Sequence, residues 1–345
     1  MALWMNRAGR RGEWEQSFLQ DGRIYLQWLE LDLDLSTVVE KGNLRELLER
    51  IYPTAPTGKI SSHLGQVWIF VNTMKPGDWV GLPSKFKRVI HFGEITGGYE
   101  FDTNGEPGRR HYRSVTWFAP DIPRSNFSQD ILYSFGAAGT ICGIDAENRV
   151  RSMAKNGWKP ETGLPQDKVT IRDGGTGPLG IDLEESARDQ IANLIARKYK
   201  GHGMAVLVEA LLKAQGYTTH RSPEGPDYGI DILAGPGPLG FGQPRLVVQV
   251  KSGDTPIDRP TIDQLIGTMQ NVHAEQGLFV SWSGFKSSVD KEKARQFFRV
   301  RLWDQNALID QILDNYDKLD EDLRAELPLK RIWTVAQTEE TTSEE

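Results

Sequence analysis

Short apolar runs alternate with segments of helical periodicity between residues 183 and 326, and this alternation constrains the fold more than any other feature of the chain. β-Branched and other apolar residues predict strands at 230–234, 246–251, 278–282 and 300–303. Apolar residues spaced three and four apart predict helices at 184–199, 204–214, 261–273, 288–297, 306–316 and 320–326. Strands that alternate with helices predict an α/β domain built on a mixed sheet.

The segment before it, residues 18–150, has a different pattern. β-Branched and aromatic residues between Gly, Pro and Asn predict short strands at 24–29, 66–72, 78–81, 89–96 and 114–118. Residues 43–52 carry an apolar stripe at helical spacing, and Pro53 follows directly, so one helix is predicted there. The combination predicts a small β-barrel with helices.

Residues 156–182 are rich in Gly, Pro and charge and have no sustained apolar period, which is typical of a linker. We therefore expect an N-terminal domain at 1–155, a C-terminal domain at 183–330 and an acidic tail at 331–345.

Composition excludes several classes of protein. The single cysteine, Cys142, excludes an intramolecular disulfide and a multi-cysteine zinc site. No apolar run approaches the ~18 residues of a membrane span, and the N-terminus lacks the apolar core of a signal peptide, so we expect a cytoplasmic protein without membrane contact. The net charge of −6 does not exclude nucleic acid as a partner, because a basic cleft can lie in an acidic protein.

Three polar residues interrupt two of the apolar strands. In VVQVK at 247–251, Gln249 and Lys251 are two residues apart and project to one face of the strand. Asp231 interrupts GIDILA, eighteen residues before Gln249, a separation typical of adjacent strands joined by a turn. Taken singly, each is typical of a polar group on an edge strand. Together they predict a carboxylate, an amide oxygen and an ammonium group at one place.

Phosphodiester hydrolysis requires these groups. A divalent cation, Mg²⁺ or Mn²⁺, neutralises developing charge and activates water. Mg²⁺ prefers a few hard oxygen ligands, and Asp231 and Gln249 each supply one. Lys251 can orient the attacking water and stabilise the charge of the transition state.

The same segment resembles the Mrr-type restriction endonuclease domain of the PD-(D/E)xK superfamily. The matching text is LVEALLKAQGY, GPDYGIDILA, VVQVKSG, TIDQLIGTM and GLFVSWSGF, in that order. This family has Gln in place of the usual second-strand Glu, as at Gln249. The resemblance implies that Asp231 is the metal carboxylate, Gln249 the second ligand and Lys251 the catalytic lysine.

One position departs from that family. Many relatives carry an acidic residue early in the first helix, where this chain has Ala205. Glu209 lies one turn later on the same face and is a candidate catalytic replacement, or else a solvated helix residue. His202 and His220 are interpreted as structural residues.

Residues 66–101, with LQWLELDLDLS before them and RRHYRSVTW after them, resemble the PUA/EVE/YTH-like barrels of some modification-dependent restriction proteins. Such barrels bind a flipped base in an aromatic cage, held by stacking and by hydrogen bonds to its edge. The candidate cage residues are Trp28, Trp68, Trp79 and Tyr99, each of which can instead be a core residue. Candidate contacts to the DNA backbone are Lys87, Arg88, Arg110 and Arg113, each of which can instead be a solvated surface charge.

These features predict a Mg²⁺-dependent endodeoxyribonuclease that cuts double-stranded DNA carrying modified bases, with modified cytosine as the expected base. Two alternatives stay open: a repair or processing nuclease without modification specificity, and a catalytically weak nucleic-acid-binding protein. Double-strand cutting usually requires two active sites, so we expect a homodimer.

Overall fold

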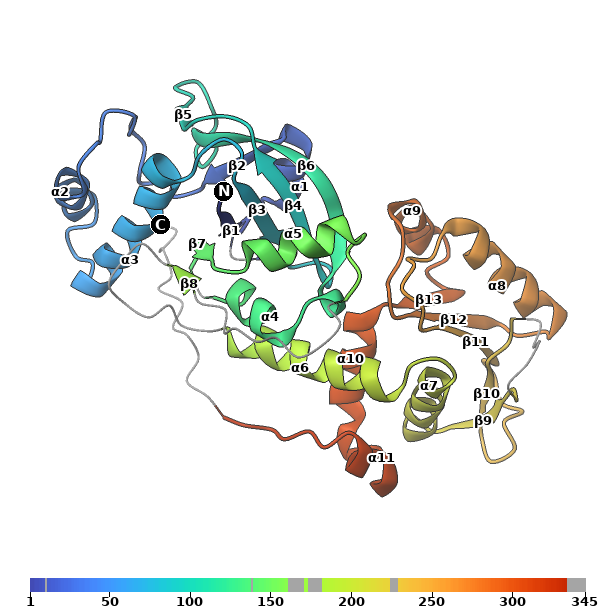
Figure 1. The fold of residues 1–345 in the computed structure, drawn as a ribbon. Helices are drawn as coiled ribbons and strands as arrows, with labels where there is room; N and C mark the ends of the chain where they lie inside the picture. The colour runs from blue at the N-terminus through green and yellow to red at the C-terminus, as the bar shows by residue number, and fades with distance from the viewer. Residues whose placement is uncertain (10, 138, 161–170, 173–181, 224–228, 334–345) are drawn as a thin grey trace. The chain divides into compact units, whose positions relative to one another are not determined.

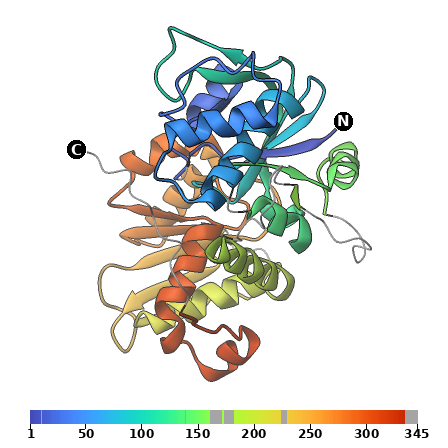
Figure 2. The same ribbon diagram turned by 90° about the vertical axis from the view of Figure 1, so that its left-hand side faces the viewer.

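The computed structural model describes residues 1–9, 11–137, 139–160, 171–172, 182–223 and 229–333 (Figures 1 and 2). The chain divides into two compact units, Met1–Ala196 and Arg197–Glu345, and each is described by itself. Most of the predicted linker at 156–182 and of the predicted tail at 331–345 lies outside the described residues.

The first unit is built on one curved sheet with the strand order β2-β6-β4-β3-β1-β7-β8, and β5 pairs with β6. Among the described strands of this unit, β1 and β3 form the one parallel pair. No pairing between described residues joins β2 to β8, so the sheet is an open half-barrel where the sequence predicted a barrel. The strands are β1 Leu3–Asn6, β2 Arg23–Leu26, β3 Trp79–Pro83, β4 Val89–Ile95, β5 Glu100–Phe101, β6 His111–Pro123, β7 Ile141–Ile144 and β8 Ile171–Arg172.

Both faces of this sheet are packed. Val80 and Leu82 lie in a core with apolar residues of α1 (Glu15–Asp21), α2 (Lys41–Ile51) and α3 (Thr57–Trp68). Side chains that point to the other face of the sheet, such as Leu3, Met5 and Phe92, lie in a second core with α4 (Gln129–Phe135) and α5 (Glu147–Lys155). The strands therefore separate two groups of helices, as the pleat requires.

The predicted strand at 66–72 is wrong. Residues 66–68 end α3, and Ile69–Thr73 form the π-helical turn η1. The β-branched residues there favoured a strand, but Ile60, Leu64 and Val67 continue a buried helical stripe that begins upstream. Packing of that stripe into the core overrides local strand propensity.

Helix α6 (Leu183–Lys198) packs on the first unit. The sequence analysis instead placed the residues from 183 onward in the second domain. Arg124, which is 1% exposed, forms two hydrogen bonds to the Asp189 carboxylate, from Nε at 3.0 Å and Nη2 at 2.6 Å. Gln190 donates to the Tyr133 hydroxyl at 2.7 Å. Partners this distant in sequence give no local signal, which explains the difference.

The second unit contains a mixed five-stranded sheet of order β13-β12-β11-β10-β9. Strands β11, β12 and β13 are parallel, and β9 and β10 are antiparallel to their neighbours. The strands are β9 Tyr217–Arg221, β10 Ile232–Pro236, β11 Leu246–Lys251, β12 Gln276–Ser281 and β13 Val300–Trp303. The predicted α/β fold with a mixed sheet is confirmed.

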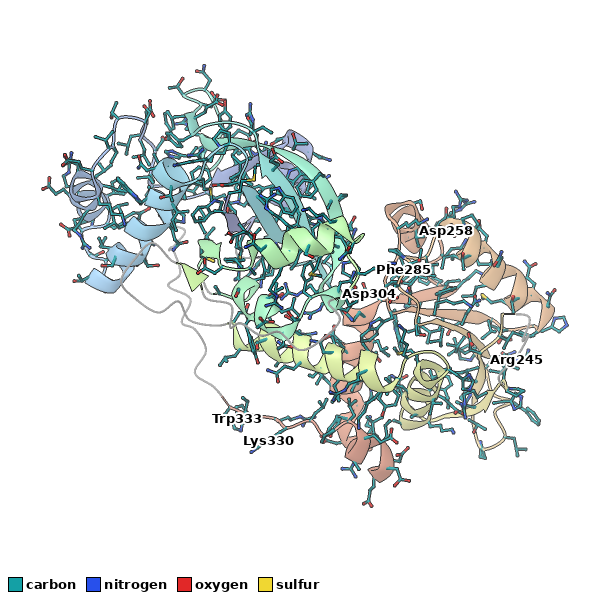
Figure 3. The ribbon with its side chains drawn as sticks, viewed as in Figure 1. Arg245, Asp258, Phe285, Asp304, Lys330 and Trp333 are labelled. Atoms are coloured by element: carbon teal, nitrogen blue, oxygen red, sulfur yellow. The ribbon has the colours of Figure 1, made fainter. Side chains whose placement is uncertain are left out.

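Aspartate side chains cap the N-termini of some helices of the second unit. Asp258 caps α8 (Arg259–Asn271) through Thr261, and Asp304 caps α10 (Gln305–Asn315) through Ala307 (Figure 3). The remaining helices are α7 Gly203–Ala214, α9 Ser287–Arg295, η3 Tyr316–Lys318 and α11 Glu321–Glu326.

Helices α7 and α8 lie on opposite faces of this sheet (Figure 1). Val247 and Phe279 pack in one core with Ile262 and Leu265 of α8, which defines the α8 face.

Across the described part of the chain, no helix combines the length and apolar character needed to cross a membrane.

Candidate active site

The ladder between β10 and β11 brings Asp231 opposite Gln249. Ile232 pairs with Val248 and Leu233 with Val247. The backbone N–H of Asp231 donates to the Val248 carbonyl at 3.0 Å, which extends the ladder by one residue. Asp231 and Gln249 are therefore neighbours on adjacent strands, as their spacing in the sequence predicted.

Alternation along β11 fixes the face on which the site lies. Val247 packs toward α8, so Gln249 and Lys251 project from the same α8 face. Gln249 is next to Phe279, which belongs to the α8 core. The structure thus places Asp231, Gln249 and Lys251 along one face at the end of β11.

The Asp231 carboxylate is held by the backbone of β11. Its Oδ2 accepts a hydrogen bond from the Val250 N–H at 2.8 Å, and its carbonyl accepts one from the Ser222 N–H at 2.9 Å. Hydrogen bonds to the charged form of a carboxylate stabilise it. An anionic oxygen is consequently positioned over the strand that carries the other two residues.

Gln249 and Lys251 make no side-chain hydrogen bond or ion pair with the part of the chain that the structure describes. Gln249 is only 6% exposed, and a buried amide without a partner is costly. Lys251 is exposed at the end of the strand. Both groups are thus available to a ligand that can accept or donate hydrogen bonds.

Gly229 is a contributor that the sequence analysis missed. Its φ of +80° suits glycine, and a Cβ there would lie 3.4 Å from the Gln249 side-chain nitrogen. The signal in the sequence was a glycine two residues before Asp231. A Cβ at that distance would make an ordinary contact, so the positive φ, not the space, is what favours glycine here.

Glu209 lies on the other side of the sheet. It projects from α7 toward Thr219 and Arg221, whose alternation on β9 places them on the α7 face. Its Oε1 accepts from Thr219 at 2.9 Å and lies 3.1 Å from the Lys213 ammonium, and its Oε2 accepts from Arg221 at 3.0 Å. Burial would raise its pKa, but these hydrogen bonds and the charges of Lys213 and Arg221 outweigh burial and lower it. Its catalytic role is an untested prediction that this geometry does not favour, because both oxygens are engaged on the α7 face.

The donor set at the site fits a hard divalent cation. Asp231 offers an anionic oxygen and the unbonded Gln249 amide a neutral one, and Mg²⁺ in such sites usually takes one or two carboxylates and keeps several waters. No cluster of three or more His, Cys, Asp or Glu side chains suited to a metal occurs among the described residues.

The four candidate cage residues do not come together in one cluster. Trp28, Trp68 and Tyr99 lie at the margin of the core shared with α2 and α3, whereas Trp79 lies at the margin of the opposite core. The Trp79 ring packs against Phe118, with the Arg151 guanidinium 4.1 Å from its centroid. The sheet therefore separates Trp79 from the other three.

Trp28 has aromatic partners that the sequence did not indicate. Its ring lies 4.4 Å from that of His63, centroid to centroid, and His63 packs edge-on against Tyr52 at 5.1 Å. Burial lowers the pKa of His63 to about 4, and its Nδ1 is buried with no hydrogen-bond partner in the described residues. We call Trp28, Tyr52 and His63 the aromatic cluster. Tyr99 instead bonds His111 at 2.8 Å through its hydroxyl.

The four candidate backbone contacts differ in exposure. Arg113 is buried, and its guanidinium donates to the carbonyls of Phe70 at 2.6 Å and Val71 at 2.9 Å. Arg88 is largely buried and pairs with Asp189. Lys87 is half-buried, with Asp121 3.4 Å from its ammonium, and the half-buried Arg110 pairs with Asp32. Contacts to DNA by these residues stay predictions, and Lys87 and Arg110 are the accessible ones.

Comparison with known protein families gives one match in each unit. Residues 196–312 match the family described as "Restriction endonuclease", Mrr_cat. Residues 4–132 match a domain of unknown function, DUF8426. The predicted Mrr-type domain is confirmed, whereas the first unit is matched to a domain of unknown function and not to the PUA, EVE or YTH group. No curated protein matches the chain.

Two solved restriction enzymes are similar to the chain at low identity. The DNA modification-dependent restriction endonuclease AspBHI is 16% identical, with a TM-score of 0.34 over 82% of this chain and 73% of that one. MspJI restriction endonuclease, solved in complex with a 27-mer oligonucleotide, is 15% identical, with a TM-score of 0.32 over 89% of this chain and 74% of that one. Likenesses this weak assign no residue a role.

Proposed function

We propose, on the premise that residues 196–312 are a restriction endonuclease domain, that the chain is a modification-dependent DNA endonuclease. One observation carries the catalytic part of the proposal. Asp231, Gln249 and Lys251 lie on one face of the sheet, and the amide and ammonium groups have no partner in the described residues. This arrangement provides ligands and a cation for a phosphate at one place.

Each residue has a distinct task in phosphodiester hydrolysis. Asp231 and Gln249 would hold Mg²⁺ or Mn²⁺ through a carboxylate and an amide oxygen. When bound, the cation supplies Lewis-acid stabilisation of the phosphate charge and activation of water. Lys251 would donate a hydrogen bond to a phosphate oxygen or to the attacking water, and its positive charge stabilises the negative charge that develops.

Recognition of a modified base is proposed for the first unit. The aromatic cluster around Trp28 supports it, since stacked rings at the margin of a core can hold a base that leaves the duplex. The buried Nδ1 of His63, which has no hydrogen-bond partner among the described residues, adds a polar atom to this cluster. The proposed partner is double-stranded DNA with a modified cytosine, cut by a homodimer that brings two active sites to the two strands.

The catalytic assignment is tested by substitution. Lys251→Ala should abolish cutting of a duplex substrate and leave its affinity nearly unchanged, because one lysine is a small part of the phosphate contacts. Asp231→Ala should also abolish cutting and weaken the binding of Mg²⁺ measured by calorimetry. EDTA should stop cutting by the unaltered protein.

Lys318→Ala is the matched control, since Lys318 is an exposed lysine of η3 outside this site. It should cut at the normal rate. Full activity of Lys251→Ala would remove Lys251 from the reaction centre.

A further inference from the structure

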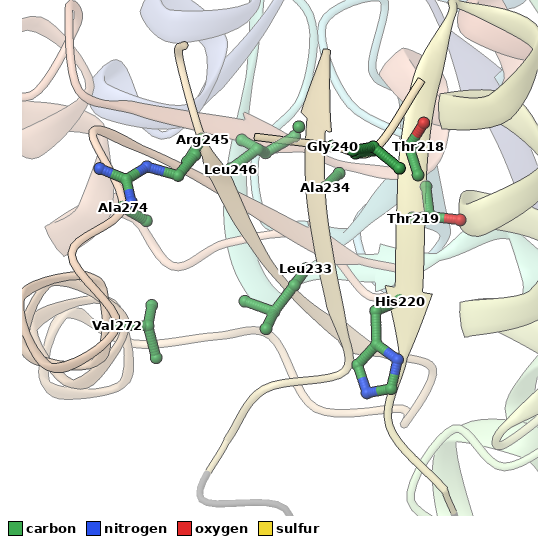
Figure 4. A pocket seen from close by; sticks show the side chains of 12 residues that line it. Thr218, Thr219, His220, Leu233, Ala234, Gly240, Arg245, Leu246, Val272 and Ala274 are labelled. Atoms are coloured by element: carbon green, nitrogen blue, oxygen red, sulfur yellow. The ribbon is translucent and has the colours of Figure 1, made fainter. Parts of the chain in front are cut away.

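An open cleft of about 390 Å³ lies in the second unit, along β9 and β10 (Figure 4). Leu233 and His220 lie side by side across β10 and β9. Leu239 and Gly240, in the connection from β10 to β11, form one wall, and Val272 and Ala274, which follow α8, form the other. Nothing in the catalytic assignment uses this cleft.

The cleft is on the same face of the sheet as the reaction centre. His220 pairs with Leu233, and the next pair of the same parity is Ser222 with Asp231. Leu233 follows Asp231 by two residues, about 7 Å along the strand. Successive nucleotides of one strand are about 3.4 Å apart along the helix axis and roughly twice that along the backbone, so the cleft begins one or two nucleotides from a phosphate held at Asp231.

The chemistry of the lining suits a nucleotide. Leu233, Val272 and Ala274 offer an apolar surface to a sugar. His220 is exposed and forms no side-chain hydrogen bond or ion pair with the described residues, so its ring N–H is available to a phosphate oxygen. The other polar groups are engaged: the Thr218 hydroxyl donates to the Gly237 carbonyl at 2.7 Å, and Arg245 pairs with Glu275 at 3.1 Å.

The wall of the cleft is fixed by close backbone contact. A Cβ at Gly235 would lie 2.1 Å from the Gly240 carbonyl oxygen, which no side chain permits. The connection from β10 to β11 is thus folded tightly onto the strand. The cleft therefore exists before DNA binds, which lowers the entropic cost of binding there.

We propose that this cleft binds a nucleotide one or two positions from the scissile phosphate, with its sugar on Leu233 and its phosphate hydrogen-bonded to His220. This inference rests on the proposed endonuclease function and adds a second point of contact to the cut strand. Two contacts on one strand set the register of that strand at the reaction centre.

The test uses full-length protein and a duplex whose cut site has been mapped with the unaltered enzyme. Binding is measured in a Lys251→Ala background, so that the strand stays intact. Each phosphate within three nucleotides of the cut is replaced in turn by a neutral methylphosphonate. One replacement, one or two nucleotides from the cut, should raise Kd roughly fivefold to tenfold, the effect of losing one hydrogen bond to a charged group at an exposed site.

Adding His220→Ala should raise Kd for the natural duplex by a similar factor and abolish the effect of that one methylphosphonate. His273→Asn is the control, because His273 is an exposed histidine next to two lining residues but outside the lining, and Asn tolerates its φ of 52°. It should keep the full methylphosphonate effect. Circular dichroism checks that each variant is folded.

The inference would be overturned if the methylphosphonate effect were unchanged in His220→Ala. It would also be overturned if no methylphosphonate near the cut raised Kd in the Lys251→Ala protein. Either result leaves the proposed function intact if the unaltered enzyme cuts the duplex. Failure of that enzyme to cut any DNA would overturn the proposed function, and the nucleotide site with it.

Discussion

The ion pairs of Glu185, a residue of α6, allow a prediction about the stability of the first unit. Its side chain is 11% exposed, with Oε1 3.2 Å from the Arg124 guanidinium and Oε2 2.8 Å from the Lys85 ammonium. Burial alone would raise its pKa, but the charges of Arg124 and Lys85 outweigh burial and lower the pKa from 4.5 to about 2. A lowering of this size corresponds to roughly 3 kcal/mol of stabilisation of the folded state.

The sign of the pH dependence follows from that direction. Because the pKa is lower in the folded state, this stabilisation is complete above about pH 4.5 and is lost as the pH falls toward 2. Glu185→Gln should therefore lower the free energy of unfolding of the first unit by roughly 3 kcal/mol at pH 7. The difference between variant and unaltered protein should shrink steadily below pH 4.5.

Urea unfolding followed by tryptophan fluorescence measures this quantity. Most tryptophans lie in the first unit, namely Trp4, Trp14, Trp28, Trp68, Trp79, Trp117 and Trp158. Glu184→Gln is the matched control: the same substitution one residue earlier, at a side chain that is 81% exposed, should change stability little. Equal effects of the two substitutions, or a Glu185→Gln effect that does not depend on pH, would refute the reasoning.

Three further predictions concern the site and the recognition of DNA. Glu209→Gln should lower the free energy of unfolding by about 1–3 kcal/mol, because the charged hydrogen bonds of Glu209 are lost. It should leave the Mg²⁺ concentration for half-maximal cutting unchanged. A higher Mg²⁺ requirement would make Glu209 a metal ligand. Trp28→Ala should weaken binding of modified duplex about 5- to 150-fold in a folded protein. Trp79→Phe, on the other face of the sheet, should not weaken it. Equal losses of affinity for modified and plain duplex would remove Trp28 from base recognition. Arg110→Ala should weaken binding of both duplexes alike and flatten the salt dependence of Kd, and a loss confined to modified DNA would contradict a backbone role.

Much of the second unit could be predicted from the sequence because its signals are local. Strands β11 and β13 have the bounds that their apolar runs predicted. The alternation in VVQVK also predicted that Gln249 and Lys251 share a face, and the ladder places Asp231 beside them. A pattern that repeats within one element needs no tertiary information.

The features that were missed depend on contacts distant in sequence. Arg113 and Arg88 were interpreted as DNA contacts or surface charges. In the structure Arg113 donates to the Phe70 carbonyl, and Arg88 pairs with Asp189. His220 was interpreted as structural, and only the pairing of β9 with β10 shows that it shares a face with Asp231. The position of a side chain relative to a second strand is set by register, which the sequence does not display.

We propose that this chain cuts DNA at Asp231, Gln249 and Lys251 in response to a modified base. The most direct measurement compares initial rates of cleavage of otherwise identical duplexes that carry plain, methylated, hydroxymethylated or glucosylated cytosine, in Mg²⁺, with Lys251→Ala run in parallel. We predict cleavage of at least one modified duplex, little cleavage of the plain one and none by the variant. Equal rates on all four duplexes, or cutting that persists in Lys251→Ala, would contradict the account.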